Sequence, residues 1–269
     1  MDERTQSEFS RPFTPRSHSP RSLCVMTREI YPARDERKSP KKTLRRLVEF
    51  RGITRGSLLQ YRNRIKHMYD GPAGAVLVFG SLMSLHEPLV GRMFRRRKFD
   101  VSGCKSILDV GSGAGQILGH LLKRAHPESR LVAFDLSHQM LRRARTRLAS
   151  DRPSYVTGDL TQLPFADSSF DCITCGWVIE HLPDPRPGLR ELSRVLQPGG
   201  RLLLLATEDT LPGMVVSRTW QCRTYNRREL RATCDEVGLP WRSQLWLTPF
   251  HRFFKIGGIL VEAQKPWNE

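Results

Sequence analysis

Long apolar runs are missing from this sequence of 269 residues. No stretch approaches the roughly 18 consecutive apolar residues that a membrane-spanning helix needs, so we expect no transmembrane segment. The first forty residues lack the apolar core of a secretory signal, and we therefore expect a cytoplasmic protein. Peripheral contact with a membrane surface stays compatible with these observations.

Cysteine is also sparse, and the six cysteines are scattered along a chain too long to need disulfides for stability: Cys24, Cys104, Cys172, Cys175, Cys222 and Cys234. We expect them to be reduced. Cys172 and Cys175 form a Cys-x-x-Cys pattern, but on a strand this odd spacing points the two thiols to opposite faces. No second pair with zinc-like spacing exists, so we expect no metal site.

Acidic residues are scarce in the first part of the chain. Residues 1–105 hold 23 Lys and Arg against 10 Asp and Glu, whereas residues 106–269 hold 21 against 17. A basic excess fits a nucleic acid or an anionic membrane as partner, and equally a solvated arginine-rich tail. Residues 1–42 are rich in Ser, Pro and Arg without periodicity, which predicts a disordered or loosely packed basic tail. Translation could start at Met1 or at Met26.

Residues 43–100 have apolar residues at helical spacing, for example Leu58, Tyr61 and Ile65, and end in the basic run Arg95 to Lys98. This pattern predicts an N-terminal helical cap. A basic amphipathic helix can lie on a membrane or along nucleic acid. We favour the interpretation that these helices cover the domain that follows.

From residue 101 to residue 269 strands and helices alternate. We predict strands at 106–110, 130–134, 154–157, 170–176 and 201–206, helices at 114–125, 137–149, 185–196 and 227–237, and two late strands at about 241–247 and 256–263. Repeated strand–helix units predict an α/β fold with a doubly wound, mostly parallel, seven-stranded sheet.

A glycine-rich turn follows the first of these strands. The apolar run from Ile107 to Val110 leads into Gly111, Gly113 and Gly115, and a helical pattern follows. Strand, glycine turn and helix hold nucleotide-like ligands at the carboxyl edge of a parallel sheet. Glycine permits the tight turn and the close approach of backbone to ligand. The triplet alone is a weak signal.

Two carboxylates indicate which nucleotide-like ligand is expected. Asp135 ends the second predicted strand, where an acid accepts hydrogen bonds from ribose hydroxyls. The third glycine of the dinucleotide fingerprint is replaced by Gln116, which argues against NAD. Asp109 precedes the glycine turn, and its charge would repel a pyrophosphate but suit an ammonium group. S-adenosylmethionine combines ribose, adenine and an amino acid end without phosphate, and fits better.

Five motifs in order resemble the class I S-adenosylmethionine-dependent methyltransferases, and in particular the small-molecule group that includes the quinone-biosynthesis C-methyltransferases. They lie at 107–115, 133–141, 158–160, 163–171 and 190–200. The resemblance implies a Rossmann-like methyltransferase fold for residues 101–269. It covers about a hundred residues well and leaves residues 1–100 uncovered.

The resemblance also implies a role for each matching residue. The methionine end of the cofactor would be held by Asp109 and by the backbone of Gly111, Ser112, Gly113 and Gly115. The ribose would be bound by Asp135. The adenine would be bound by Leu136, Met140, Asp159 and Leu160, and the methyl channel would be lined by Gly176 and Trp177.

The expected function is methyl transfer to a small-molecule acceptor that is aromatic, quinone-like or lipid-like. Acidic acceptors need a general base, and the candidates are Glu180 and His181, of which we choose His181. One alternative is an RNA methyltransferase that uses the basic N-terminal region. Against it, Gly176–Ile179 stands where many base N-methylating enzymes have an Asn/Asp-Pro-Pro-aromatic motif. Another alternative is a non-catalytic S-adenosylmethionine-binding interaction module.

Overall fold

The computed structural model describes residues 60, 63, 86–254 and 257–267. The predicted tail at 1–42 lies outside these residues, as does most of the predicted cap at 43–100. The cap's described part includes helix α4 (His86–Arg95).

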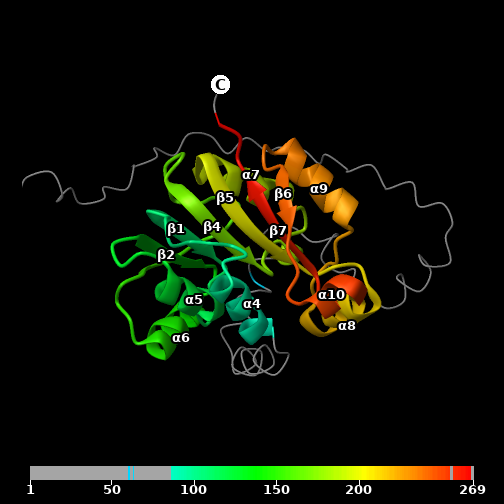
Figure 1. The fold of residues 1–269 in the computed structure, drawn as a ribbon, viewed down its shortest axis with the longest axis horizontal. Coiled ribbons are helices and arrows are strands. Elements are labelled where there is room, and N and C mark those ends of the chain that lie inside the picture. Colours follow the sequence, from blue (N-terminus) through cyan, green and yellow to red (C-terminus); the bar gives the residue numbers. More distant parts are fainter. Residues whose placement is uncertain (1–59, 61–62, 64–85, 255–256, 268–269) are drawn as a thin grey trace, which may run out of the picture. The chain divides into compact units, whose positions relative to one another are not determined.

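The described chain folds around one seven-stranded sheet (Figure 1). Its strands are β1 (Ser106–Val110), β2 (Arg130–Asp135), β3 (Ser154–Thr157), β4 (Phe170–Gly176), β5 (Leu196–Ala206), β6 (Trp241–Gln244) and β7 (Ile259–Gln264). Their order across the sheet is β3-β2-β1-β4-β5-β7-β6. Strands β1 to β5 pair in parallel, and β7 pairs antiparallel with both β5 and β6. The predicted fold class is therefore confirmed.

Helices cover both faces of the sheet, as a doubly wound topology requires. One face packs against α7 (Arg186–Val195) and α9 (Arg227–Glu236). The other packs against α4, α5 (Gln116–Arg124) and α6 (His138–Leu148). Cys172 lies in the core on the α4 and α5 side and Cys175 in the core on the α7 side, so the two thiols point to opposite faces as predicted.

Two short helices were not predicted from the sequence. Helix α8 (Leu211–Trp220) begins after a Thr210 side chain that accepts a hydrogen bond from the Gly213 N–H, and α10 (Pro249–Phe254) buries none of its residues. Both carry apolar residues on their solvent side, which hides the amphipathic period that identifies a helix. Among the helices described, none is long and apolar enough to cross a bilayer.

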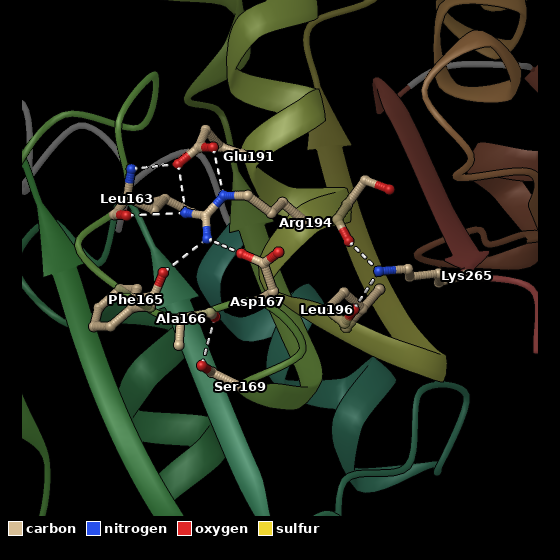
Figure 2. Close-up of polar contacts among 10 residues, drawn as sticks. Leu163, Phe165, Ala166, Asp167, Ser169, Glu191, Arg194, Leu196 and Lys265 are labelled. Carbon is tan, nitrogen blue, oxygen red and sulfur yellow. Dashed lines mark hydrogen bonds and ion pairs between the residues drawn. The ribbon is translucent and has the colours of Figure 1, made fainter. Parts of the chain in front are cut away.

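The loop between β3 and β4 is fixed to α7 by Arg194 and by Glu191, which accepts from the Leu163 N–H at 2.7 Å (Figure 2). Arg194 donates to the Leu163 carbonyl oxygen at 3.0 Å, to the Phe165 carbonyl oxygen at 2.8 Å and to Asp167 Oδ1 at 2.7 Å. It also forms a two-point contact with Glu191, at 2.7 and 2.8 Å. The Leu163–Phe165 segment is therefore held against α7 as a structural turn.

Removing this arginine should loosen the loop and destabilise the fold. We expect Arg194→Ala to lower the free energy of unfolding by about 2 kcal/mol, because two backbone carbonyls and two carboxylates lose a charged donor. Arg190→Ala on the same helix is the matched control. Arg190 is exposed, and its ion pair in the described part of the chain is with Glu236, at 3.5 Å, so its loss should cost less than about 0.5 kcal/mol. Urea unfolding measures both, and equal effects would contradict the assignment.

Candidate active site

The glycine loop after β1 is held against the end of β2. The N–H groups of Gly111 and Ser112 both donate to the Phe134 carbonyl oxygen, at 2.7 and 3.1 Å. Gly111 has a φ of 69°, and a Cβ there would lie 2.0 Å from Val178 Cγ2. Only glycine fits this position, because a side chain would meet both a strained backbone and the Val178 methyl group.

Asp135 links the same loop to the start of α6. Its Oδ2 atom accepts from the Gly113 N–H and its Oδ1 atom from the Ser137 N–H, each at 2.8 Å. Each carboxylate oxygen has two lone pairs and can accept more than one hydrogen bond, as binding of ribose hydroxyls would require. The structure thus brings the predicted ribose acid and the predicted backbone cradle into direct contact.

Asp109 is buried beneath the loop, and one of its two carboxylate oxygens has a hydrogen-bond partner among the described residues. Its Oδ1 atom accepts from Thr174 Oγ1 at 2.6 Å, and its Oδ2 atom has no hydrogen-bond partner among the residues described. Burial raises the pKa of Asp109 to about 7, the charge of Asp135 adds to the rise, and the hydroxyls of Thr174 and Ser112 oppose it. A buried carboxylate oxygen without a donor is suited to receive one from a ligand.

The predicted adenine side lies between α6 and the loop after β3. Met140 is buried on α6, and Leu136 packs against the core beside it. Asp159 Oδ1 accepts from the N–H and the hydroxyl of Thr161, at 2.7 and 2.8 Å, so this acid caps a turn. The Leu160 side chain is buried within the α7-side core. The adenine roles of these residues stay predictions.

Gly176 and Trp177 follow β4. A Cβ at Gly176 would lie 2.6 Å from Ile117 Cδ1, so the glycine lets β4 pack closely against α5 without a shift of the Ile117 side chain. Trp177 has a φ of 56°, donates its N–H to the Leu205 carbonyl oxygen at 2.9 Å and packs against the core on the α5 side. Both positions are explained by packing, and their channel role stays a prediction.

The two base candidates lie on a short 3-10 helix, η1 (Ile179–His181), and both are buried. Glu180 Oε1 accepts from Thr207 Oγ1 at 2.7 Å, while Oε2 has no hydrogen-bond partner in the described part of the chain. Burial raises the pKa of Glu180 to about 7, against the opposing hydrogen bond from Thr207. Glu180 therefore has the properties of a base at neutral pH at least as clearly as the predicted His181.

Two threonines that hold these acids were not found from the sequence. Thr174 lies on β4 and binds Asp109 of β1, and Thr207 follows β5 and binds Glu180. No local pattern marks either residue, because each contact depends on which strands are neighbours in the sheet.

Residues 108–204 match a family model described as a methyltransferase domain. A ubiquinone/menaquinone biosynthesis C-methyltransferase of Desulfotalea psychrophila is 32% identical over 148 residues, which cover 55% of this chain and 58% of that protein. A demethylmenaquinone methyltransferase of Clavibacter sepedonicus is 34% identical over 153 residues, which cover 56% of this chain and 61% of that protein. The match thus spans less than two thirds of these relatives.

Solved structures of methyltransferases share this fold. A Haloferax volcanii methyltransferase in complex with the activator Trm112 covers 76% of this chain and 98% of its own, with a TM-score of 0.63 and 21% identity. An S-adenosylmethionine-dependent methyltransferase of Aquifex aeolicus covers the same shares, with a TM-score of 0.54 and 19% identity. The chain thus shares its fold with S-adenosylmethionine-dependent methyltransferases. Asp109 Oδ2 and the glycine cradle fit the amino acid end of S-adenosylmethionine.

Cofactor affinity should depend on the glycine loop and on Asp135. We expect Gly111→Ala to abolish S-adenosylmethionine binding, because the new Cβ would meet Val178. Asp135→Ala should weaken binding at least tenfold, which is about 1.4 kcal/mol. Calorimetric titration measures both, with Asp151→Ala as an exposed acidic control. Binding of NADH in place of S-adenosylmethionine would contradict the assignment.

The affinity should also depend on pH, through Asp109. Its raised pKa of about 7 means that the free protein holds this carboxyl largely protonated at pH 6. An ammonium group binds the ionised form, so binding releases a proton and weakens about tenfold from pH 8 to pH 6. Titrations at both pH values test this. The Asp109→Asn variant should bind S-adenosylmethionine weakly at both pH values. The control Glu180→Gln should show the same change of affinity with pH as the wild type. A wild-type affinity that does not depend on pH would contradict the role of Asp109.

Proposed function

We propose that this chain transfers the methyl group of S-adenosylmethionine to a carbon atom of a small aromatic, quinone-like or lipid-like acceptor. The observation that carries the proposal is the unpartnered, buried Oδ2 atom of Asp109 beneath the glycine loop. It supplies a negative site for an ammonium group where a phosphate-bearing cofactor would be repelled. The relative named as a ubiquinone/menaquinone biosynthesis C-methyltransferase supports the acceptor class and the choice of carbon, and the one named as a demethylmenaquinone methyltransferase supports the acceptor class.

The surface at the carboxyl edge supports an apolar acceptor. Helix α8 follows β5 and α10 precedes β7, and because Ala206 pairs with Ile259, both helices connect to this edge of the sheet. They expose large apolar side chains, namely Leu211, Val215, Val216, Phe250, Phe253 and Phe254. An exposed apolar patch of this kind is typical of a binding surface.

The cofactor supplies a methyl group on a sulfonium, which is already a good leaving group. The protein's task is then to orient the acceptor, which can contribute about 7–11 kcal/mol, and to exclude water. A carbon nucleophile must also lose a proton. We assign this proton to the Glu180 carboxylate, with His181, its neighbour on η1, as the second candidate.

We further propose a cytoplasmic location, where thiols stay reduced. The five cysteines in the described ranges are all free. The RNA alternative has less support, since Gly176–Ile179 stands where many base N-methylating enzymes have an Asn/Asp-Pro-Pro-aromatic motif. The expected acceptor is therefore a metabolite and not a polyanion.

A labelling assay tests the activity. The full chain is incubated with methyl-labelled S-adenosylmethionine and either a metabolite and lipid extract or total RNA. We expect label in an organic-soluble small molecule, and loss of this label in Asp135→Ala. Label in RNA would favour the nucleic acid alternative, and cofactor binding without any labelled product would favour the non-catalytic one.

The base assignment has its own test. Glu180→Gln should lower kcat by about a hundredfold or more while leaving cofactor affinity at pH 8 within about twofold. Glu236→Gln, an exposed acid on α9, is the control. Should His181→Ala lose the activity while Glu180→Gln retains it, the base is His181.

A further inference from the structure

Two cysteines from different segments meet at the amino edge of the sheet, opposite the glycine loop. Cys104 lies in the loop between α4 and β1, and Cys172 lies on β4, where it pairs with Ile107 of β1. Their thiols share a hydrogen bond, and both belong to the core that packs against α4 and α5. A disulfide requires two facing side chains with adjacent sulfur atoms, so a hydrogen-bonded thiol pair needs little motion to close.

A guanidinium group lies beside one of the two thiols. Arg201 of β5 pairs with Cys172 across the sheet, and its Nη2 atom is 3.8 Å from Cys104 Sγ. The same guanidinium donates to the Asp100 carbonyl oxygen and stacks on Phe99. A fixed cation next to a sulfur atom favours the thiolate, which is the reactive form of cysteine.

The ionisable surroundings favour Cys104 as the first thiol to react. The hydrogen bond from Cys172 lowers the pKa of Cys104 to about 7, burial opposes this, and Arg201 adds to the lowering. Asp171 on β4 raises the pKa of Cys104. Glu262 on β7 forms an ion pair with Arg201, with Oε1 at 3.4 Å from Nη1. Burial instead raises the pKa of Cys175 and of Cys234, so these thiols are unreactive by comparison.

Accessibility separates the two members of the pair. Cys104 is 8% exposed and Cys172 is fully buried. Both thiols are buried, and Cys104, which keeps some exposed surface, is the one that a small oxidant would reach first. A low-pKa thiol beside a second, fully buried thiol resembles the cysteine pairs that respond to oxidants.

We propose that Cys104 and Cys172 are a hydroperoxide-sensitive thiol pair that closes to an intramolecular disulfide. The Cys104 thiolate attacks one peroxide oxygen, the O–O bond breaks, and the leaving alkoxide or hydroxide takes a proton from water. The resulting sulfenic acid is then attacked by the Cys172 sulfur, the S–OH bond breaks, and water leaves with the Cys172 proton. The two sulfur atoms lose two electrons in total, and the peroxide gains them.

Peptide mapping of the full chain tests the pair. The experiment uses a Cys24→Ser background, because Cys24 lies outside the described residues. Reduced protein is treated with hydrogen peroxide, denatured and alkylated. We expect a mass loss of about 2 Da before alkylation, three remaining alkylatable thiols of the five present, and a cross-linked peptide joining Cys104 to Cys172. Five free thiols after treatment, or another cross-link, would overturn the proposal.

Two variants and a pH series separate this chemistry from general oxidation. In Cys172→Ser, Cys104 should accumulate as a sulfenic acid that dimedone traps, and Cys104→Ser should leave Cys172 alkylatable. Cys234→Ser is the control and should form the same disulfide as its parent. At pH 7 a thiol with a pKa of about 7 is half ionised, about fifteenfold more than a thiol of pKa 8.5, so oxidation should reach half its maximal rate near pH 7. A midpoint near 8.5 would contradict the role of Arg201.

Discussion

A carboxylate that water cannot reach lies under the glycine loop, and the site depends on it. Burying a charge is costly unless hydrogen bonds or an opposite charge compensate. Thr174 compensates one oxygen of Asp109, and the other oxygen has no donor among the residues described. Burial therefore raises the pKa of this carboxyl to about 7 in the free protein, and a cationic ligand group would stabilise the ionised form. This constraint would let a Rossmann-like loop select an amino acid end instead of a phosphate.

The glycine loop stays in place above Asp109 because the ends of neighbouring strands contact the loop from several sides. Phe134 and Asp135 of β2 bind its N–H groups, while Val178, which follows β4, packs over Gly111. Beyond β4, Glu180 is tied to Thr207 after β5, and the Tyr225 hydroxyl donates to the Ile179 carbonyl oxygen at 2.8 Å. The cofactor side and the proposed acceptor side are thus connected through β4 and the segment that follows it.

The two edges of the sheet have different chemistry. At the carboxyl edge, Asp109 and Glu180 each have one carboxylate oxygen without a partner among the described residues, and α8 and α10 expose apolar side chains. These features suit a cationic cofactor and an apolar acceptor. The amino edge carries the Cys104–Cys172 pair beside Arg201. Because crossovers in a parallel sheet place loops of different origin at each edge, one sheet can hold two unrelated reactive groups without interference.

The sequence alone determined where the strands and the main helices lie along the chain, because hydrophobic periodicity and glycine turns are local signals. It also indicated the ligand, since Asp109, the glycines and Asp135 are close along the chain or at strand ends. It missed α8 and α10, whose apolar residues face outward. Only the tertiary structure decided which acid is buried and what each one contacts. Thr174 lies 65 residues from Asp109 and Thr207 lies 27 from Glu180, and strand neighbours in a parallel sheet are set by crossovers that no local pattern records.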